Sequence, residues 1–365
     1  MSSDTPTLAT ASPAPIASEK SNGATSATIT NTHMPLFAPI RLPIRRRLQT
    51  GAVLIWISAL AVCTMSFFYL CTIKYLWPLI IIYLLWILMF DQAPEKGGRR
   101  FSWWRNWVGW PYFAQYFPMT LIKEGDLDPS KNYIFGYHPH GIISLGAFCT
   151  FATEGLNFSK RFPGIVPRLL TLQSNFQIPF YRDYIMAHGC ASVSKESCEY
   201  ILKSGLGNSI AIVVGGAQES LAAKPGTLDL TLKKRLGFIK LALVNGASLV
   251  PTLAFGENDL YELYSATHAS KTYQIQQFMK KMLGFTMPMF NGRGIFNYEF
   301  GLLPRRKPVF IVIGKPIHVE KVEGAPTTEQ LQDLQKKYID ELLAIWERYK
   351  DKYAVGRTQE LQIIE

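Results

Sequence analysis

The sequence lacks the short motifs that identify several common classes of protein. Its five cysteines are scattered and none forms a CxxC pair, which favours reduced, buried thiols in a chain that faces the cytosol. There is no GxSxG nucleophile elbow, no Walker A loop and no GxGxxG following an apolar run. These absences argue against an elbow-type serine hydrolase, a P-loop enzyme and a dinucleotide-binding enzyme.

Nucleic-acid-binding motifs are absent as well, although the chain is basic. It carries a net charge of +11 with no zinc finger, no recognisable single-stranded RNA module and no long basic helix. The positive charge therefore indicates an anionic bilayer surface or a polyphosphate substrate, and we expect no nucleic acid partner. The mean hydropathy of +0.07 is high for a soluble enzyme and indicates a membrane segment.

The first 40 residues have few large apolar side chains and are rich in Ser, Thr, Ala and Pro. Such a composition cannot bury enough apolar surface to fold, so we predict a disordered tail over residues 1–40. No apolar run begins near the N-terminus, which argues against a secretory signal.

A long apolar run lies within residues 50–90, from Ala52 to Phe90. Its length of about 39 residues is nearly twice the ~20 that cross a bilayer once. Lys74 and Pro78 interrupt it near the middle. We predict a two-helix transmembrane hairpin that either crosses fully or dips in and returns; the alternative is one long buried helix.

Basic residues flank this run on both sides. By the positive-inside tendency both ends, and hence both termini, face the cytosol. A hairpin satisfies this and a single span does not. Only Lys74 lies between the halves, and the flanking residues are Arg41, Arg45, Arg46, Arg47, Lys96, Arg99, Arg100 and Arg105.

An aromatic segment follows over residues 91–120, with the stretch FSWWRNWVGWPYFAQYFP at its centre. Seven of the eight tryptophans lie between Trp56 and Trp110. Because Trp and Tyr prefer the headgroup layer, we predict that this segment lies on the membrane surface. The alternative is a small aromatic core.

Residues 121–365 show the pattern of an α/β domain. The stretches YIFGY, SIAIVVGG, SLVPTLAFG and PVFIVIG are typical of buried strands bounded by Gly or Pro. KKRLGFIKLALVNGA predicts a helix, and residues 327–353 predict a long amphipathic one. Strands that alternate with helices indicate a largely parallel sheet.

Two histidines, His138 and His140, stand on either side of Pro139 where the first of these strands ends. In open α/β sheets ligands gather beyond the carboxyl ends of strands. Three interpretations are open: a catalytic base held by a stiff turn, a metal site, or a turn with structural histidines. A metal site has little support, because no third ligand stands at helical or hairpin spacing nearby.

Two further features carry polar groups. The strand SIAIVV ends in Gly215-Gly216, with Glu219 just beyond. Glycines allow close backbone approach to a ligand, and Glu219 could orient a histidine, pair with a basic residue or lie in solvent. The basic residues Lys234, Arg235 and Lys240 either form a solvated face or meet anionic headgroups or coenzyme phosphates.

Taken together, these motifs closely resemble those of the type-2 diacylglycerol acyltransferase family, which includes monoacylglycerol and wax-alcohol acyltransferases, and most of all its fungal members. The matching stretches are Tyr116-Phe117-Pro118, His138-Pro139-His140-Gly141, Gly215 to Glu219, RLGFIKLALVNGASLVP from Arg235, FGEND from Phe255 and GKPIHV from Gly314. They occur in the order and at the spacing of the family, over nearly everything after residue 40.

The resemblance implies a membrane-anchored α/β acyltransferase that moves a fatty acyl group from acyl-CoA to the hydroxyl of diacylglycerol. It implies His140 as general base with His138 in support, since some plant members have Glu-Pro-His here. The Asp found five residues after the catalytic His in distant glycerolipid acyltransferases is absent, so Glu219 is the first candidate for the orienting acid. Oxyanion donors are expected at the turn from Pro139 to Ile142 or at Gly215-Gly216. The residues expected to bind substrate are Tyr116, Phe117, Pro118, Gly141, Gly215, Gly216, Lys234, Arg235 and Lys240.

The resemblance further implies the endoplasmic reticulum membrane, with lipid droplets as a second location, and no cofactor or metal. The acceptor stays open between diacylglycerol, monoacylglycerol and a long-chain alcohol, and a homo-oligomer is compatible with the sequence. A lipid-binding protein of the droplet surface without enzymatic activity is the alternative from another class. A metal-dependent hydrolase is the third alternative.

Overall fold

The computed structural model describes residues 37, 39, 41–263 and 290–364. The predicted disordered tail lies outside the described residues, apart from residues 37 and 39.

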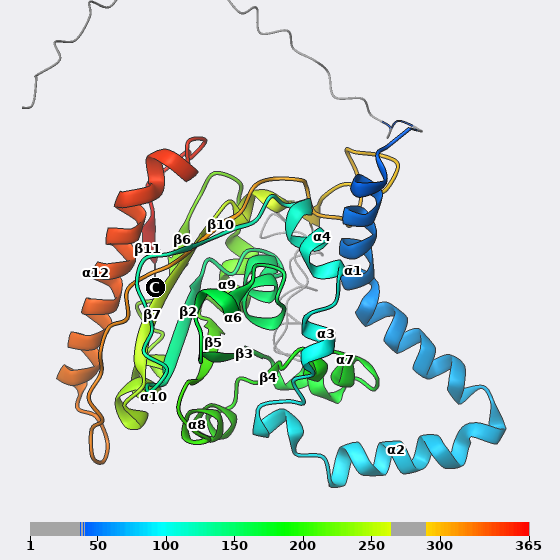
Figure 1. Ribbon diagram of the computed structural model, residues 1–365, viewed down its shortest axis with the longest axis horizontal. Helices are drawn as coiled ribbons and strands as arrows, with labels where there is room; N and C mark the ends of the chain where they lie inside the picture. The colour runs from blue at the N-terminus through cyan, green and yellow to red at the C-terminus, as the bar shows by residue number, and fades with distance from the viewer. Residues whose placement is uncertain (1–36, 38, 40, 264–289, 365) are drawn as a thin grey trace, which may run out of the picture. The chain divides into compact units, whose positions relative to one another are not determined.

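A seven-stranded sheet forms the centre of the α/β domain (Figure 1). From β7 to β4 neighbouring strands are parallel, whereas β10 pairs antiparallel with β7 and parallel with β1. The predicted largely parallel sheet is therefore confirmed, and the four predicted strands are β2, β5, β7 and β10. The strand order is β1 (Thr120–Lys123), β10 (Phe310–Ile313), β7 (Ser248–Phe255), β2 (Tyr133–His138), β5 (Asn208–Val213), β3 (Val166–Thr171), β4 (Ala191–Ser192).

Two separate cores cover the two faces of this sheet, because successive side chains of a strand point to opposite faces. Tyr133, Phe135 and Tyr137 of β2 enter an aromatic core. Ile134 enters the other core, which helices α8 (Lys195–Lys203), α10 (Gly237–Asn245) and α12 (Thr328–Tyr353) complete. Figure 1 shows α12 lying along the sheet on the side away from α1.

Helix α12 agrees with its predicted amphipathic pattern. Thr327 and Gln330 form a capping box that fixes its start. Leu334, Tyr338 and Leu342 are buried on the face toward β7. Tyr338 lies below the end of β2 and becomes part of the site described below.

Shorter elements complete the domain. They are α5 (Leu145–Ala147), the π-helical turn η3 (Phe148–Ala152), α6 (Phe158–Arg161), η4 (Gln173–Gln177), α7 (Tyr181–Ala187), α9 (Gly216–Ala222), η5 (Glu257–Leu260), and the small pairs β6 (Asp229–Thr231) with β11 (Gln362–Ile364) and β8 (Glu262–Leu263) with β9 (Phe290–Asn291).

The apolar run forms two helices that break where Lys74 and Pro78 predicted. Helix α1 spans Ile44–Cys71, a turn η1 covers Lys74–Leu76, and α2 spans Trp77–Met89. Among the described residues α1 alone is long and apolar enough to cross a membrane, since α2 has 13 residues. The two helices diverge from their shared turn, and α2 runs back toward the α/β domain (Figure 1). A hairpin of two full spans therefore stays a prediction.

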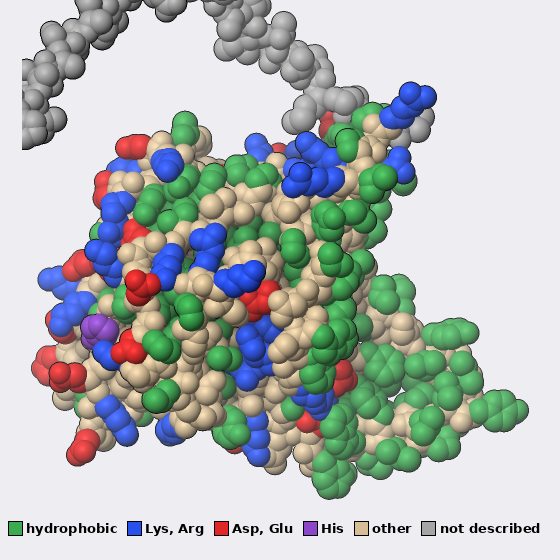
Figure 2. Space-filling view, viewed as in Figure 1, with side chains coloured by type: hydrophobic (Ala, Val, Ile, Leu, Met, Phe, Trp, Pro, Cys, Tyr) green, Lys and Arg blue, Asp and Glu red, His purple; other side chains and the backbone are tan. Residues whose placement is uncertain are grey.

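Their surfaces are strongly apolar (Figure 2). Exposed large side chains include Met65, Phe68 and Leu88, at 72%, 64% and 76% exposure. The first half of α1 instead packs on α4 (Gly109–Tyr116), where Ala52 and Val53 are buried and Trp56 contacts Phe113.

The aromatic segment after α2 is divided between core and surface. It contains η2 (Ala93–Lys96), α3 (Ser102–Arg105) and α4. Trp110 and Phe113 are fully buried in the aromatic core, whereas Trp103 and Val108 are about 70% exposed, at 71% and 70%. The alternative of a small aromatic core thus fits Trp110 and Phe113, and the predicted position on the membrane surface fits Trp103 and Val108.

Candidate active site

Three adjacent parallel strands deliver the chemistry-bearing residues to one edge of the sheet. The turn His138-Pro139-His140-Gly141 follows β2, the Gly215-Gly216 turn follows β5, and Glu257 follows β7. Because β2 lies between β7 and β5, both neighbours flank the histidine turn. This is the position at which open α/β sheets bind ligands.

His138 points away from the aromatic core and is fully buried. Its Nε2 lies 3.0 Å from the Tyr338 hydroxyl, which donates to the Gly136 carbonyl at 3.1 Å. Since that hydroxyl has one proton, His138 Nε2–H acts as the donor in their contact. Burial lowers the pKa of His138 to about 3, so its ring is neutral. Its predicted role as a support for His140 stays a prediction.

His140 lies on the other side of the cis peptide bond between His138 and Pro139 and is partly exposed. Its Nδ1–H donates to the Gly141 carbonyl at 3.0 Å. This contact fixes the tautomer in which Nε2 carries the lone pair. Burial of the ring lowers the pKa of His140, so the imidazole is neutral and able to accept a proton at neutral pH.

Glu219 of α9 contacts His140, but through the backbone. Its Oε2 accepts the His140 backbone N–H at 2.7 Å, and its Oε1 accepts the Thr231 N–H at 2.8 Å. The predicted link between this acid and the histidine is therefore present with a different atom: the carboxyl positions the turn, and the Gly141 carbonyl orients the ring. Burial raises the pKa of Glu219 to about 7.

Glu257 contacts the same segment from the side of β7, and the sequence did not lead to a prediction of this residue. Its Oε2 accepts the Tyr137 hydroxyl at 2.8 Å and the Gly146 N–H at 3.1 Å. Burial raises its pKa to about 7. The available signal was its place in FGEND, directly after a buried strand that neighbours β2.

Two glycines make room for these carboxyls. A Cβ on Gly215 would lie 1.7 Å from the Glu219 carboxyl carbon, so only glycine lets that carboxyl fold back over the turn. Gly141 has a φ of +58°, and its Cβ would lie 2.8 Å from Glu257 Cγ. Both were predicted to contact substrate, which stays a prediction; the structure shows that both accommodate a carboxyl side chain.

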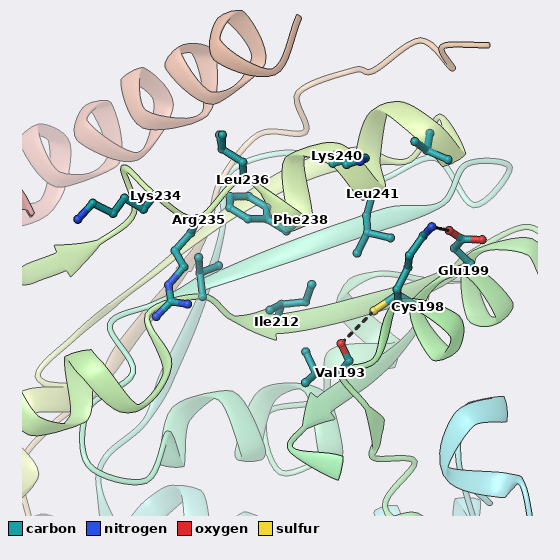
Figure 3. Close-up of a pocket in the computed structure, with 14 residues that line it drawn as sticks. Val193, Cys198, Glu199, Ile212, Lys234, Arg235, Leu236, Phe238, Lys240 and Leu241 are labelled. Carbon is teal, nitrogen blue, oxygen red and sulfur yellow. Dashed lines mark hydrogen bonds and ion pairs between the residues drawn. The ribbon is translucent and has the colours of Figure 1, made fainter. Parts of the chain in front are cut away.

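A basic pocket opens beside the Gly215 turn, between α8 and α10 (Figure 3). It has a volume of about 500 Å³ and an apolar floor that includes Ile212 and Val214 of the β5 end. The predicted residues Lys234, Arg235 and Lys240 all line it, together with Lys195. Arg235 contacts the Gly215 carbonyl at 3.4 Å and so joins the pocket to the turn that carries Glu219.

The three residues Tyr116, Phe117 and Pro118 are not among this group. Tyr116 and Phe117 are buried in the aromatic core, and Pro118 is exposed. The Tyr116 hydroxyl donates to the Pro304 carbonyl at 2.7 Å, and the Arg306 guanidinium lies 4.0 Å from the centre of its ring. Through Tyr116, these contacts join the end of α4 to the segment that precedes β10.

Within the part of the chain that the structure describes, no three His, Cys, Asp or Glu side chains gather as metal ligands. The arrangement is therefore described by its organic groups: a neutral imidazole with an available lone pair, two buried carboxyls that hold its turn, and a cationic pocket nearby. This is a site suited to base-assisted transfer of a group from an anionic carrier.

Comparison with known proteins places the chain in one family. The diacylglycerol acyltransferase family matches residues 67–364, so the chain belongs to that family. Its relatives include diacylglycerol O-acyltransferase 2A of Umbelopsis ramanniana, 56% identical over 91% of this chain and 94% of that protein. The Dictyostelium discoideum diacylglycerol O-acyltransferase 2 is 50% identical over 90% of this chain and 100% of that protein.

Another relative is a 2-acylglycerol O-acyltransferase 1 of Bos taurus, 45% identical over 89% of this chain and 98% of that protein. No solved structure matches the chain. The resemblance noted in the sequence is confirmed, and the chain is an acyltransferase of this family.

Proposed function

We propose that this protein transfers a fatty acyl group from acyl-CoA to the free hydroxyl of diacylglycerol, giving triacylglycerol and free coenzyme A. The observation that carries the mechanism is the fixed tautomer of His140, with Nδ1–H on the Gly141 carbonyl and the lone pair on Nε2. Relatives at 50–56% identity, named diacylglycerol O-acyltransferases, support the donor and acceptor classes.

In the reaction, His140 Nε2 takes the proton of the acceptor hydroxyl as its oxygen attacks the thioester carbon. The C–S bond then breaks, and the histidine returns the proton to the departing thiolate. A base of this kind contributes about 10²–10⁴ in rate. Because Glu219 occupies the His140 backbone N–H, the candidate oxyanion donors are the remaining N–H groups of the turn and those of Gly215-Gly216.

The pocket between α8 and α10 suits the nucleotide end of acyl-CoA. Its exposed rim residues Lys234, Arg235 and Lys240 match the phosphates, and its apolar floor can accept the adenine. Arg235 contacts Gly215, and the turn of Gly215 follows the strand next to β2, which supports a single extended donor that reaches both the pocket and His140.

The apolar helices supply the acceptor from the membrane. Both of their ends are tied to the same domain: Arg306 contacts Gln49 and Thr50 near the start of α1, and Asp91 after α2 pairs with Arg182 at 2.7 Å. A segment whose two ends lie on one domain enters and leaves the bilayer on one side, in agreement with cytosolic termini.

Of the two hairpin forms, we favour the one that dips in and returns. The half of α1 beyond Ala59, the last of its buried residues, has 12 residues and α2 has 13. At 1.5 Å per residue each arm is roughly 20 Å long, shorter than the ~30 Å hydrocarbon layer. A hairpin with arms of this length can insert into one leaflet of the endoplasmic reticulum membrane or into the single lipid layer of a droplet.

The test uses membranes from a host without triacylglycerol synthesis of its own. Wild type and His140→Ala are expressed at equal levels and supplied with labelled acyl-CoA and diacylglycerol. We expect labelled triacylglycerol from the wild type and a trace from the variant.

Other outcomes would lead to a different assignment. Label in diacylglycerol after supply of monoacylglycerol, or in wax ester after supply of an alcohol, would show that the acceptor is not diacylglycerol. No product from either protein would support the non-enzymatic lipid-binding alternative. Loss of activity with a chelator would instead support a metal-dependent mechanism.

A further inference from the structure

A second apolar surface lies beside the start of α1, away from α2. The loop of residues 291–303, which precedes β10, exposes Phe296, Phe300 and Leu302 at 75%, 70% and 68%. Beside it Phe37 and Ile44 are exposed at 67% and 76%, and Phe37 bridges Asn297 of the loop. We call these five residues the loop surface; Figure 1 shows its loop next to the first turns of α1.

The loop is firmly built at its base. Arg293 and Leu303 exchange backbone hydrogen bonds of 2.6 and 2.8 Å, and Gly292 donates to the Gly301 carbonyl at 2.9 Å. The Asn291 side chain donates to the Glu299 carbonyl at 2.8 Å. The exposed apolar side chains thus extend from a loop whose base is held by backbone hydrogen bonds.

The loop is also fixed to α1. Arg306, three residues beyond Leu303, donates to Gln49 Oε1 at 2.7 Å and to Thr50 Oγ1 at 2.9 Å. Exposed apolar residues continue along α1 through Leu48, Leu54 and Ile55 to its outer half. The side of α1 that lies between the loop surface and the outer half of the hairpin therefore carries exposed apolar residues as well.

Its charge surroundings identify the partner. Residues 37–50 and 290–307 together carry eight Lys and Arg side chains and a single acid, Glu299. Arg41 and Arg46 are exposed next to the loop surface. Aromatic and aliphatic side chains surrounded by basic ones are the composition of a surface that enters the headgroup region of an anionic lipid layer.

We propose that the loop surface is a second membrane contact, which inserts Phe296, Phe300 and Leu302 among anionic phospholipids independently of the hairpin. Because the loop lies at the start of α1 and the inserted arms of the hairpin lie beyond Ala59, the protein has two points of attachment, one near each end of α1. Two points of attachment fix the tilt of the domain relative to the lipid surface. Attachment by the hairpin alone would leave this tilt free.

The experiment uses the full chain reconstituted in vesicles, with a photoreactive p-benzoylphenylalanine at one position at a time. Phe296 is the test position, Leu88 of α2 is the positive control, and Leu206, 73% exposed between α8 and β5, is the matched negative control. Vesicles contain labelled phosphatidylcholine alone, or phosphatidylcholine with labelled phosphatidylserine.

We expect lipid adducts at positions 296 and 88 and none above background at 206. Phosphatidylserine should be enriched at 296 beyond its share of the vesicle, and Arg41→Gln with Arg46→Gln should abolish that enrichment without abolishing the phosphatidylcholine adduct. Background labelling at 296 with strong labelling at 88 would overturn the proposal while leaving the hairpin and the acyltransferase activity intact. An adduct to a second copy of the chain in place of lipid would also overturn it, and enrichment that survives both arginine changes would overturn the charge argument.

Discussion

Glu219 accepts the backbone N–H of His140 at 2.7 Å, whereas the imidazole Nδ1–H of this residue donates to the Gly141 carbonyl. The acid therefore fixes where the histidine stands, while the Gly141 carbonyl fixes how its ring is turned. Glu257 performs the corresponding task on the far side of the turn. The two carboxyls differ in how their short hydrogen bonds are divided between their two oxygens, and this difference leads to the first prediction.

Glu219→Gln should impair catalysis much more than Glu257→Gln. Glu219 uses both oxygens as acceptors, so an amide must turn an NH₂ toward one N–H donor. Glu257 takes its two shorter bonds on one oxygen, which an amide oxygen can replace. A buried hydrogen bond to a charged group contributes about 1.5–3 kcal/mol, so kcat should fall about ten- to a hundredfold in Glu219→Gln. Steady-state kinetics at matched expression measures it, and equal losses in the two variants would contradict this account.

Replacement of the two histidines by alanine should separate the base from its support. His140→Ala should lower kcat by about 10²–10⁴ with little change in thermal stability. His138→Ala leaves the buried Tyr338 hydroxyl with one contact fewer, so the free energy of unfolding should fall by about 1–3 kcal/mol. Activity assays and thermal unfolding in detergent are read side by side. A stable, inactive His138→Ala beside an active His140→Ala would reverse the assignment.

Stability should respond to pH through Glu257. Its folded-state pKa of about 7 lies above the ordinary value of 4.5, so the folded protein binds this proton more tightly than the unfolded chain. This group therefore lowers stability as the pH rises from about 4.5 to about 7. Glu257→Gln cannot ionise, so the Tm of the variant relative to wild type should rise between pH 5 and pH 8. A difference that is constant with pH would show that the carboxyl is ionised equally in both states.

The basic pocket should control the apparent affinity for acyl-CoA. Lys240→Ala should raise KM for acyl-CoA severalfold with kcat unchanged, because the lysine contacts the carrier equally in the ground and transition states. Lys337→Ala is the matched control, since Lys337 is exposed on α12 and outside the pocket lining. Initial rates over a range of acyl-CoA concentrations decide it, and an effect on the KM for diacylglycerol alone would assign the pocket to the acceptor.

A cysteine in place of Lys74 should report how deep the hairpin reaches. Cys63 and Cys71 are replaced by alanine, and a membrane-impermeant maleimide is applied to microsomes opened by a pore-forming toxin that leaves the bilayer intact. If the hairpin dips and returns, Lys74→Cys should not react, whereas Leu206→Cys in the α/β domain should react even in sealed microsomes. Reaction at position 74 only after the lumen is opened would show two full spans.

Much of this architecture is predictable because it depends on local pattern. The buried strands at residues 133–138 and 248–255 read as short apolar runs, and the break in the apolar segment follows from Lys74 and Pro78. Helix α12 is predictable in phase as well as in position, since its buried face repeats every three to four residues. Periodicity does not show how the two apolar helices are arranged, which depends on the Arg306 and Asp91 contacts.

The sequence by itself determined the class of fold, the apolar anchor, the histidine turn and three of the basic residues that line the pocket. Only the tertiary structure decided that His138 faces α12 while His140 is partly exposed, because the two side chains are separated by a turn whose path no periodicity describes. It also decided that Glu219 holds a backbone group and that Glu257 joins the site. Both acids follow neighbours of β2 in the sheet, and strand order arises from long-range pairing that a one-dimensional pattern does not encode.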